Sequence, residues 1–238
     1  VGYQSMDANT TGVSNTSVGG SSLGANITGN SLTAVGSNAL LLNTISGNTA
    51  VGANAAYSNT SGHIDAFGTN AALSNTTGSY NSAFGQQNGF YAALQNNTTG
   101  SSNAAFATGA LGSTTTGSFN TGIGVAALYS NTTASSNTAV GYQALYNNTT
   151  GSQNIAIGIS ALLSTTTATG VVAVGNTAGE AHTTQYGSTY IGHAAGYNST
   201  GQNVCIGYAS AYSGNGPTSL RAGGGNTLIG TYTGVAGA

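Results

Sequence analysis

The side chains that could support acid–base chemistry are few and lie far apart in the sequence. The chain has 238 residues and only three acids, Asp7, Asp65 and Glu180, with Arg221 as its one strong base. Glycoside hydrolysis needs two carboxyl groups within about 10 Å of each other. The repeat described below would separate Asp65 from Asp7 by about four coils and from Glu180 by about six, which is about 20 Å or more at the spacing of strands. We therefore expect no catalytic residues and no enzymatic activity.

Metal, thiol and phosphate chemistry are also poorly supported. Glu180, His182 and His193 are close in sequence, but their uneven offsets are not typical of zinc ligands, so we expect solvated loop residues. The run Gly223–Gly225 lacks the Lys-Ser/Thr of a phosphate-binding loop and predicts a flexible loop. Cys205 is the only cysteine, and its position predicts a small core residue. The sequence thus predicts no metal site and no cofactor.

Composition excludes several classes of partner. Charged residues make up 2% of the chain, the net charge is −2 and the mean hydropathy is +0.01, so Asn, Thr, Ser and Gly carry the polarity. There is no basic patch for nucleic acid or anionic lipid, and no apolar run reaches the roughly 18 residues of a membrane span. We expect no nucleic-acid partner and no membrane insertion. A nearly uncharged surface that trypsin can hardly cut suits an extracellular, cell-surface or virion-borne protein.

A 17-residue period organises the chain. Its anchor is a Gly that follows a bulky apolar residue, and Ala107 takes that place once. Eight of the thirteen intervals between successive anchors are 17 residues long, which indicates an array of small stacked units. The anchors are Gly2, Gly19, Gly36, Gly52, Gly68, Gly85, Ala107, Gly124, Gly141, Gly158, Gly175, Gly192, Gly207 and Gly230.

Aligning the repeats at their anchors gives columns of similar residues. The position before the anchor is always β-branched or Phe; we name it the bulky column and expect it in the buried core of a strand. Its members after Val1 are Val18, Val35, Val51, Phe67, Phe84, Phe106, Ile123, Val140, Ile157, Val174, Ile191, Ile206 and Ile229.

Two further columns accompany it. Four positions before the anchor is the Asn column, which consists of Asn15, Asn48, Asn81, Asn103, Asn120, Asn137, Asn154, Asn203 and Asn226. Four positions after the anchor is the Leu column, also expected in the interior, which consists of Leu23, Leu40, Leu111, Leu128, Leu145 and Leu162. A corner of the type Asn148-Thr-Thr-Gly151 follows, where Asn and Gly tolerate left-handed backbone.

These columns predict an all-β fold, a parallel β-solenoid or β-roll of about 17 residues per coil and about 13 to 14 coils. Each coil would hold one strand ending in the bulky column, a bend at the anchor, a second strand through the Leu column, and the corner. Equivalent residues of successive coils would stack about 4.8 Å apart. The Asn side chains would form amide ladders along the stack.

Deviations from the period divide the chain. We expect regular repeats over residues 1–213 with a lateral insertion near 88–92, followed by a Gly-rich loop and a final coil over 214–238. Gly179 and Gly196 replace Leu in the Leu column, so the packing should change towards the C-terminus. Val1 lies inside a repeat, which predicts a piece of a longer chain.

The repeat resembles known fibrous proteins. Asn137-Thr-Ala-Val-Gly-Tyr-Gln-Ala-Leu-Tyr146 and Asn154-Ile-Ala-Ile-Gly-Ile-Ser-Ala-Leu162 are similar to the head repeat of trimeric autotransporter adhesins, a left-handed parallel β-roll. They also resemble the repeat region of phage tail-fibre and bacterial surface proteins. The resemblance implies a homotrimeric, fibrous, extracellular or virion-borne protein that adheres or acts as a spacer.

We therefore expect a structural and adhesive segment of an extracellular fibre, non-catalytic and assembled through stacked β-coils. Its partner would be itself, as a homotrimer or an end-to-end filament, with a surface glycan or receptor as a further partner. Two alternatives are an ice-binding β-solenoid, suggested by an incomplete column with Thr49, Thr121 and Thr138, and a receptor- or glycan-binding phage tail fibre. Recurrent tyrosines such as Tyr142 could cover the coils, contact another chain or bind sugar faces.

Overall fold

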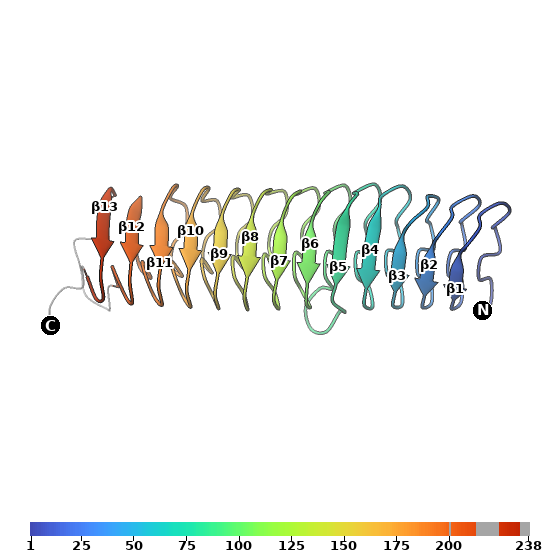
Figure 1. The fold of residues 1–238 in the computed structure, drawn as a ribbon, viewed down its shortest axis with the longest axis horizontal. Helices are drawn as coiled ribbons and strands as arrows, with labels where there is room; N and C mark the ends of the chain where they lie inside the picture. The colour runs from blue at the N-terminus through green and yellow to red at the C-terminus, as the bar shows by residue number, and fades with distance from the viewer. Residues whose placement is uncertain (200, 213–223, 234–238) are drawn as a thin grey trace. The chain divides into compact units, whose positions relative to one another are not determined.

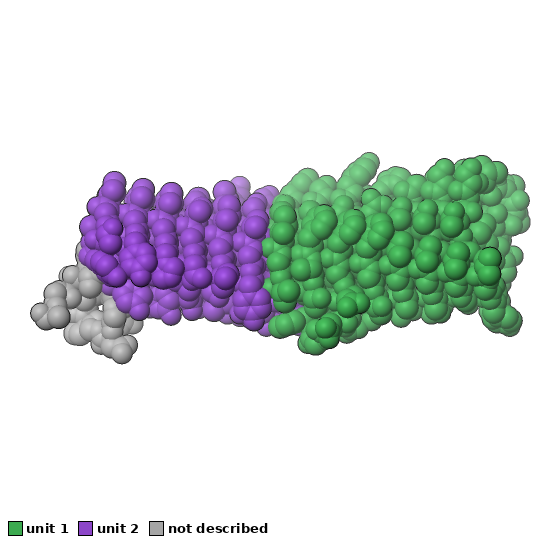
Figure 2. Space-filling view, turned by 60° about the horizontal axis from the view of Figure 1, so that its bottom comes forward, with its two compact units in different colours: residues 1–125 green, residues 126–238 purple. Residues whose placement is uncertain are grey.

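The computed structural model describes residues 1–199, 201–212 and 224–233. The regular elements of these residues are thirteen short β-strands, and the chain divides into two compact units, residues 1–125 and 126–238 (Figures 1 and 2). The first unit holds β1 (Thr16–Val18), β2 (Thr33–Val35), β3 (Thr49–Val51), β4 (Ile64–Phe67), β5 (Asn81–Phe84), β6 (Ala104–Phe106) and β7 (Thr121–Ile123). The second unit holds β8 (Thr138–Val140), β9 (Ile155–Ile157), β10 (Val172–Val174), β11 (Thr189–Ile191), β12 (Asn203–Ile206) and β13 (Asn226–Ile229).

Within each unit, strands that follow each other in the chain pair side by side, parallel and with equivalent residues opposite each other. In the first unit Val35 is the partner of Val51, and in the second unit Val140 is the partner of Ile157. Each repeat of about 17 residues therefore makes one circuit and lies directly on the preceding one (Figure 1). The predicted all-β parallel β-solenoid is confirmed.

The segment after the anchor is a series of turns, so the predicted second strand is wrong. In the coil that begins at Gly36, Asn38 and Leu40 have φ values of 58° and 51°. The amide of Ala39 donates to the carbonyl of Gly36 at 3.2 Å, while the amide of Leu40 reaches the next coil at Ala55, at 3.0 Å. Alternating left- and right-handed residues curl the chain sharply, which a short coil needs in order to close. Each coil thus has one strand.

The core consists of small residues and Leu, and the prediction that the bulky column is buried is wrong. In the strand Thr138-Ala139-Val140 only the middle residue is buried, because successive side chains point to opposite faces. The Leu column behind it is fully buried. None of the bulky column is buried: Val35, Val51, Phe67, Phe84, Val140, Val174 and Ile206 are half-buried, and Val18, Phe106, Ile123, Ile157, Ile191 and Ile229 are exposed. The thin interior has room for Ala opposite Leu, so the larger side chain faces outward.

The Asn column links neighbouring coils, mainly through the backbone. Asn137 accepts the backbone amide of Asn154 at 2.9 Å, and its Nδ2 donates to the carbonyl of Gly151, also at 2.9 Å. Seven of the nine members are buried, while Asn15 and Asn226 are partly exposed. A buried amide that satisfies two backbone groups of the next coil stabilises the stack and fixes its register.

Direct bonds between side-chain amides occur in the Asn column at two pairs, from Asn120 to Asn103 at 3.2 Å and from Asn226 to Asn203 at 3.0 Å, and a longer run of them lies in a second column, at the corners. In the first unit, Asn59 donates to Asn43 at 2.9 Å, Asn75 to Asn59 at 2.8 Å and Asn97 to Asn75 at 2.6 Å. These residues are fully buried. In the next coil the equivalent position is Thr114, so the ladder of asparagines ends there. Asn97 Oδ1 is therefore buried without a hydrogen-bond partner.

Two deviations from the period have structural counterparts. In a regular coil the amide three residues after the anchor returns to the anchor carbonyl; after Gly85 it is the amide of Ala93 that does so, at 3.1 Å. Residues 86–92 thus form the additional loop seen between β5 and β6 (Figure 1). Most of the predicted Gly-rich loop 214–225 lies outside the described residues, whereas β13 of the final coil is described.

Where Leu is lost, one tyrosine fills the core. Tyr190 occupies the inward position of β11, between Ala173 and Cys205, and is completely buried. A Cβ at Gly179 would lie 2.6 Å from the Tyr190 ring, and one at Gly196 would lie 2.1 Å from it. The two glycines therefore make room for the ring, which is the change in packing that the missing leucines predicted.

The anchor at Ala107 gives a stability prediction. Ala107 has φ 110°, a conformation that costs a residue with a Cβ about 1–2 kcal/mol. We expect Ala107→Gly to raise the free energy of unfolding by roughly 1 kcal/mol, after the entropy cost of glycine, as measured by urea denaturation. Ala110→Gly is the control: Ala110 is buried without a positive φ and should lose stability. An equal loss of unfolding free energy in both variants would show that the backbone at Ala107 is not strained.

The interrupted ladder of corner asparagines gives a second stability prediction. Thr114→Asn would restore the Asn-Thr-Thr-Gly corner and supply an Nδ2 donor to the orphaned Asn97 Oδ1. Since an unsatisfied buried acceptor costs about 1–3 kcal/mol, we expect a gain of about 1 kcal/mol in urea denaturation. The control, Thr116→Asn, changes an exposed residue of the same corner and should be neutral. If the Thr114→Asn protein were less stable than the natural one, the new amide would not continue the ladder from Asn97.

Candidate interaction surfaces

The three acids lie at separate places. Asp7 and Asp65 are both exposed in the first unit, but Asp65 lies on β4 whereas Asp7 precedes β1, so other coils separate them. Glu180 is the only acid of the second unit and faces the hydroxyl of Tyr197, which donates to it at 3.5 Å. In the described ranges no group of three His, Cys, Asp or Glu side chains could hold a metal ion.

His182 is a core residue, and the prediction that it is a solvated loop residue is wrong. It is completely buried and lies 17 residues after Thr165, in the corner column. One ring nitrogen, Nε2, lies 3.0 Å from the carbonyl oxygen of Gln185, as the Asn amides do at other corners, and Nδ1 lies 3.0 Å from the Tyr190 hydroxyl. Burial lowers the pKa of His182. Counting the period through Thr165 would have found this position in the sequence.

Cys205 is the predicted small core residue. It is buried and unpaired, and its Cα pairs with that of Tyr190 on β11. Burial raises the pKa of its thiol to about 11, so the reactive thiolate is scarce at neutral pH. Cys205 therefore belongs to the packing of the second unit.

The outward strand face of the second unit carries an apolar surface. We name it the apolar face; it consists of Val140, Tyr142, Ile155, Ile157, Ile159, Val172 and Val174. Ile155 and Ile157 are each 40% exposed, Tyr142 is 48% and Ile159 is 52% exposed. The residues belong to β8, β9 and β10 and the positions just after them, and equivalent residues pair from strand to strand. None of them is charged. Val140, Ile157 and Val174 form a continuous apolar row, and beside it lie a row in which Thr138 precedes Ile155 and Val172 and a row in which Asn176 follows Tyr142 and Ile159.

The outward face of the first unit is more varied. Phe67, Phe84 and Phe106 stack with ring centroids 4.6 and 4.8 Å apart and nearly parallel planes. At the N-terminal side, Thr16 and Thr49 flank Thr33 in one register, next to the bulky column. Aromatic and hydroxyl rows thus follow each other along one face.

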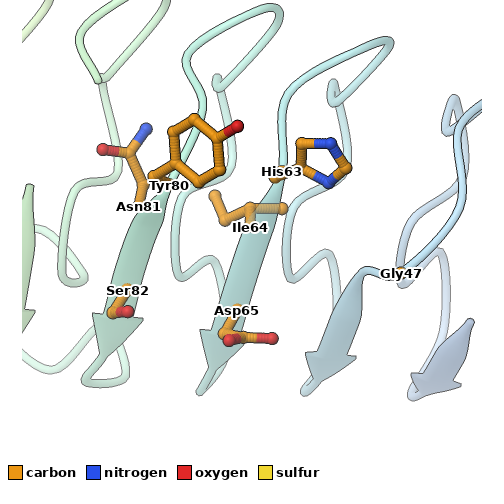
Figure 3. Close-up of a pocket in the computed structure, with 7 residues that line it drawn as sticks. All are labelled: Gly47, His63, Ile64, Asp65, Tyr80, Asn81 and Ser82. Atoms are coloured by element: carbon orange, nitrogen blue, oxygen red, sulfur yellow. The ribbon is translucent and has the colours of Figure 1, made fainter. Parts of the chain in front are cut away.

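A notch interrupts this face at β4 and β5. Its volume is about 270 Å³, and Gly47, His63, Ile64, Asp65, Tyr80, Asn81 and Ser82 line it (Figure 3). The rings of His63 and Tyr80 stack with centroids 5.7 Å apart at one end of the two strands. Asp65 and Ser82 lie towards the other end (Figure 3) and are partners in the sheet register. His63 is exposed.

Comparison with known proteins gives no relative: no family model, no curated protein and no solved structure matches this chain. Among the described residues no helix is long and apolar enough to cross a membrane.

The buried His182 predicts a pH dependence of stability. Its folded-state pKa lies below the ordinary value of 6.5, so the unfolded chain binds the proton more readily. The stabilisation is complete above about pH 6.5 and is lost as the pH falls below it. We expect the urea midpoint to drop from about pH 7 to about pH 5, and His182→Asn, which restores a corner amide, to reduce that drop. His63→Asn at the exposed histidine is the control; the same slope in all three proteins would contradict the role of His182.

Proposed function

We propose that this chain is a structural, non-catalytic segment of an extracellular fibre, which assembles with copies of itself through the apolar face. The observation that carries the proposal is the exposure of that face. A half-exposed Ile that becomes covered contributes about 1 kcal/mol, and the face offers several in adjoining rows. Large contiguous apolar patches of this kind mark interaction sites.

The regular spacing of the face favours a second copy as its partner. Its rows repeat from strand to strand at about 4.8 Å. A second copy has the same rows at the same spacing, so side chains of one copy can fit between those of the other over several coils. A globular partner has no such period. A two-fold symmetric pair joins the same face of both copies in this way, whereas in the trimer that the sequence resemblance implies the three copies of the face would surround the symmetry axis.

Charge does not oppose this association. The whole chain has a net charge of −2 from four charged side chains at neutral histidine, and the apolar face has none. Repulsion between copies is therefore weak, and the association should depend little on salt. Such a surface, with almost no site for trypsin, supports a role outside the cell, at a cell surface or on a virion.

Ice binding is the second candidate, and one observation favours it. Thr16, Thr33 and Thr49 form a register-matched row beside the β-branched Val18, Val35 and Val51, which gives three coils of regularly spaced hydroxyl and methyl groups. The row ends at Asp65. A thermal-hysteresis measurement on the purified protein would support this candidate if ice growth were inhibited.

Sedimentation velocity over a concentration series tests the self-association. We expect an oligomer for the natural sequence, and an Ile157→Ser/Ile159→Ser variant should weaken the association about tenfold or more. Ile27→Ser is the matched control, because Ile27 is 52% exposed, as Ile159 is, but does not lie on the apolar face. A natural chain that stays monomeric throughout the series would contradict the proposal, as would equal effects of Ile27→Ser and the double variant.

A further inference from the structure

The notch at β4 and β5 departs from the rest of the strand face in its chemistry. Asp65 is the only charged residue in any of the described strands. In the strands on either side of β4, Thr49 and Ser82 occupy the equivalent position. The carboxylate of Asp65 makes no hydrogen bond or ion pair with another described residue, and the residue is exposed. The coil therefore folds without using the carboxylate, which leaves it available to a ligand.

The aromatic wall of the notch is also unusual. Tyr80 has φ 60° at a repeat position that is Ser in several coils, such as Ser31 and Ser102, and that holds one other large aromatic residue, Phe119, with φ 59°. A bulky residue in this conformation is strained, yet Tyr80 is 73% exposed and gains little from burial. It stacks with His63. At the preceding coil Gly47 presents no side chain, and a Cβ there would meet nothing within 4 Å, so the wall of rings is open on that side.

The notch thus places flat rings and hydrogen-bonding groups side by side. His63 directly precedes β4 and lies two residues, about 7 Å, from Asp65, and Asp65 and Ser82 are on paired strands about 5 Å apart. The carboxylate offers acceptors, and the Ser82 and Tyr80 hydroxyls offer both donors and acceptors. Ring faces next to such groups bind ligands with an apolar side and a rim of hydroxyls.

We propose that the notch binds one pyranose residue of a neutral glycan. The C–H face of the sugar would lie on the His63–Tyr80 rings, and its hydroxyls would donate to Asp65 and exchange hydrogen bonds with Ser82. The volume of about 270 Å³ is just below the range of pockets for drug-sized molecules, which suits a single sugar ring. Asp65, in a chain of net charge −2, disfavours acidic sugars.

This site is separate from the proposed assembly. The apolar face belongs to the second unit, and the notch is formed by residues of the first unit alone. The fibre would thus combine a surface for copies of itself with a surface for sugars, and either can be removed without the other.

Saturation-transfer NMR with methyl glycosides of glucose, galactose, mannose and N-acetylglucosamine tests the proposal on the full chain. We expect at least one of them to bind, and Tyr80→Ser and Asp65→Asn each to weaken that binding about tenfold or more. Tyr3→Ser and Asp7→Asn are the matched controls, since both residues are exposed in the first unit away from the notch, and they should leave binding unchanged.

Three results would overturn the proposal: no transfer to any of the four glycosides, equal losses in the control variants, or preferential binding of the methyl glycoside of N-acetylneuraminic acid. Circular dichroism of each variant shows whether it is folded, and a variant that unfolds is replaced by Ser82→Ala, from which the same loss is expected. The Ile157→Ser/Ile159→Ser protein should keep its sugar binding while it loses association. Loss of both together would contradict an independent notch.

Discussion

The close approach of successive coils at the anchor is the constraint on which the rest of this structure depends. A Cβ added at Gly141 would lie 2.5 Å from the carbonyl oxygen of Gly158, and one at Gly158 would lie 2.3 Å from that of Gly175. Backbone thus stacks on backbone with no side chain between. This contact sets equivalent strands opposite each other without offset, and every column in the sequence is a consequence of that alignment. Ala107, with its positive φ, shows that the position admits at most a methyl group.

The same compactness decides which side chains face the interior. The strand and the turns of the Leu column close around a space that Ala and Leu fill completely. The bulky column is therefore outside, where it would normally be exposed to water. The fold obtains its alignment from small inward residues and leaves its most β-branched residues to the surface. An apolar outward face follows from the way the coil closes, and the proposed self-association would cover it.

The sequence predicted the circuit and its register but not the direction of the side chains. Eight equal intervals between anchors are enough to place Val140 on Ile157. They do not say whether Ala139 or Val140 faces inward, because the interval is the same whether the middle side chain of a three-residue strand points in or the two outer ones do. The buried Asn137 was the available indication, since it lies two residues before Ala139 and so shares its side of the strand. The second strand could not be rejected either, because nothing in the residue type of Leu145 indicates φ 52°.

The residues that deviate from the repeat are of two kinds: those that pack in the core and those that do not. Tyr190 departs from its column, and so do Gly179 and Gly196, but the three compensate one another inside the second unit. His182 likewise replaces a corner Asn and satisfies the same kind of backbone acceptor. Asp65 and Tyr80 lie outside the core instead: the carboxylate has no partner among the described residues, and the exposed Tyr80 stacks only on His63, at a left-handed backbone position that is Ser in several other coils. In an array where neighbouring coils dictate nearly every residue, an uncompensated departure is best explained by something outside the coil, and for these two residues a bound sugar would supply it.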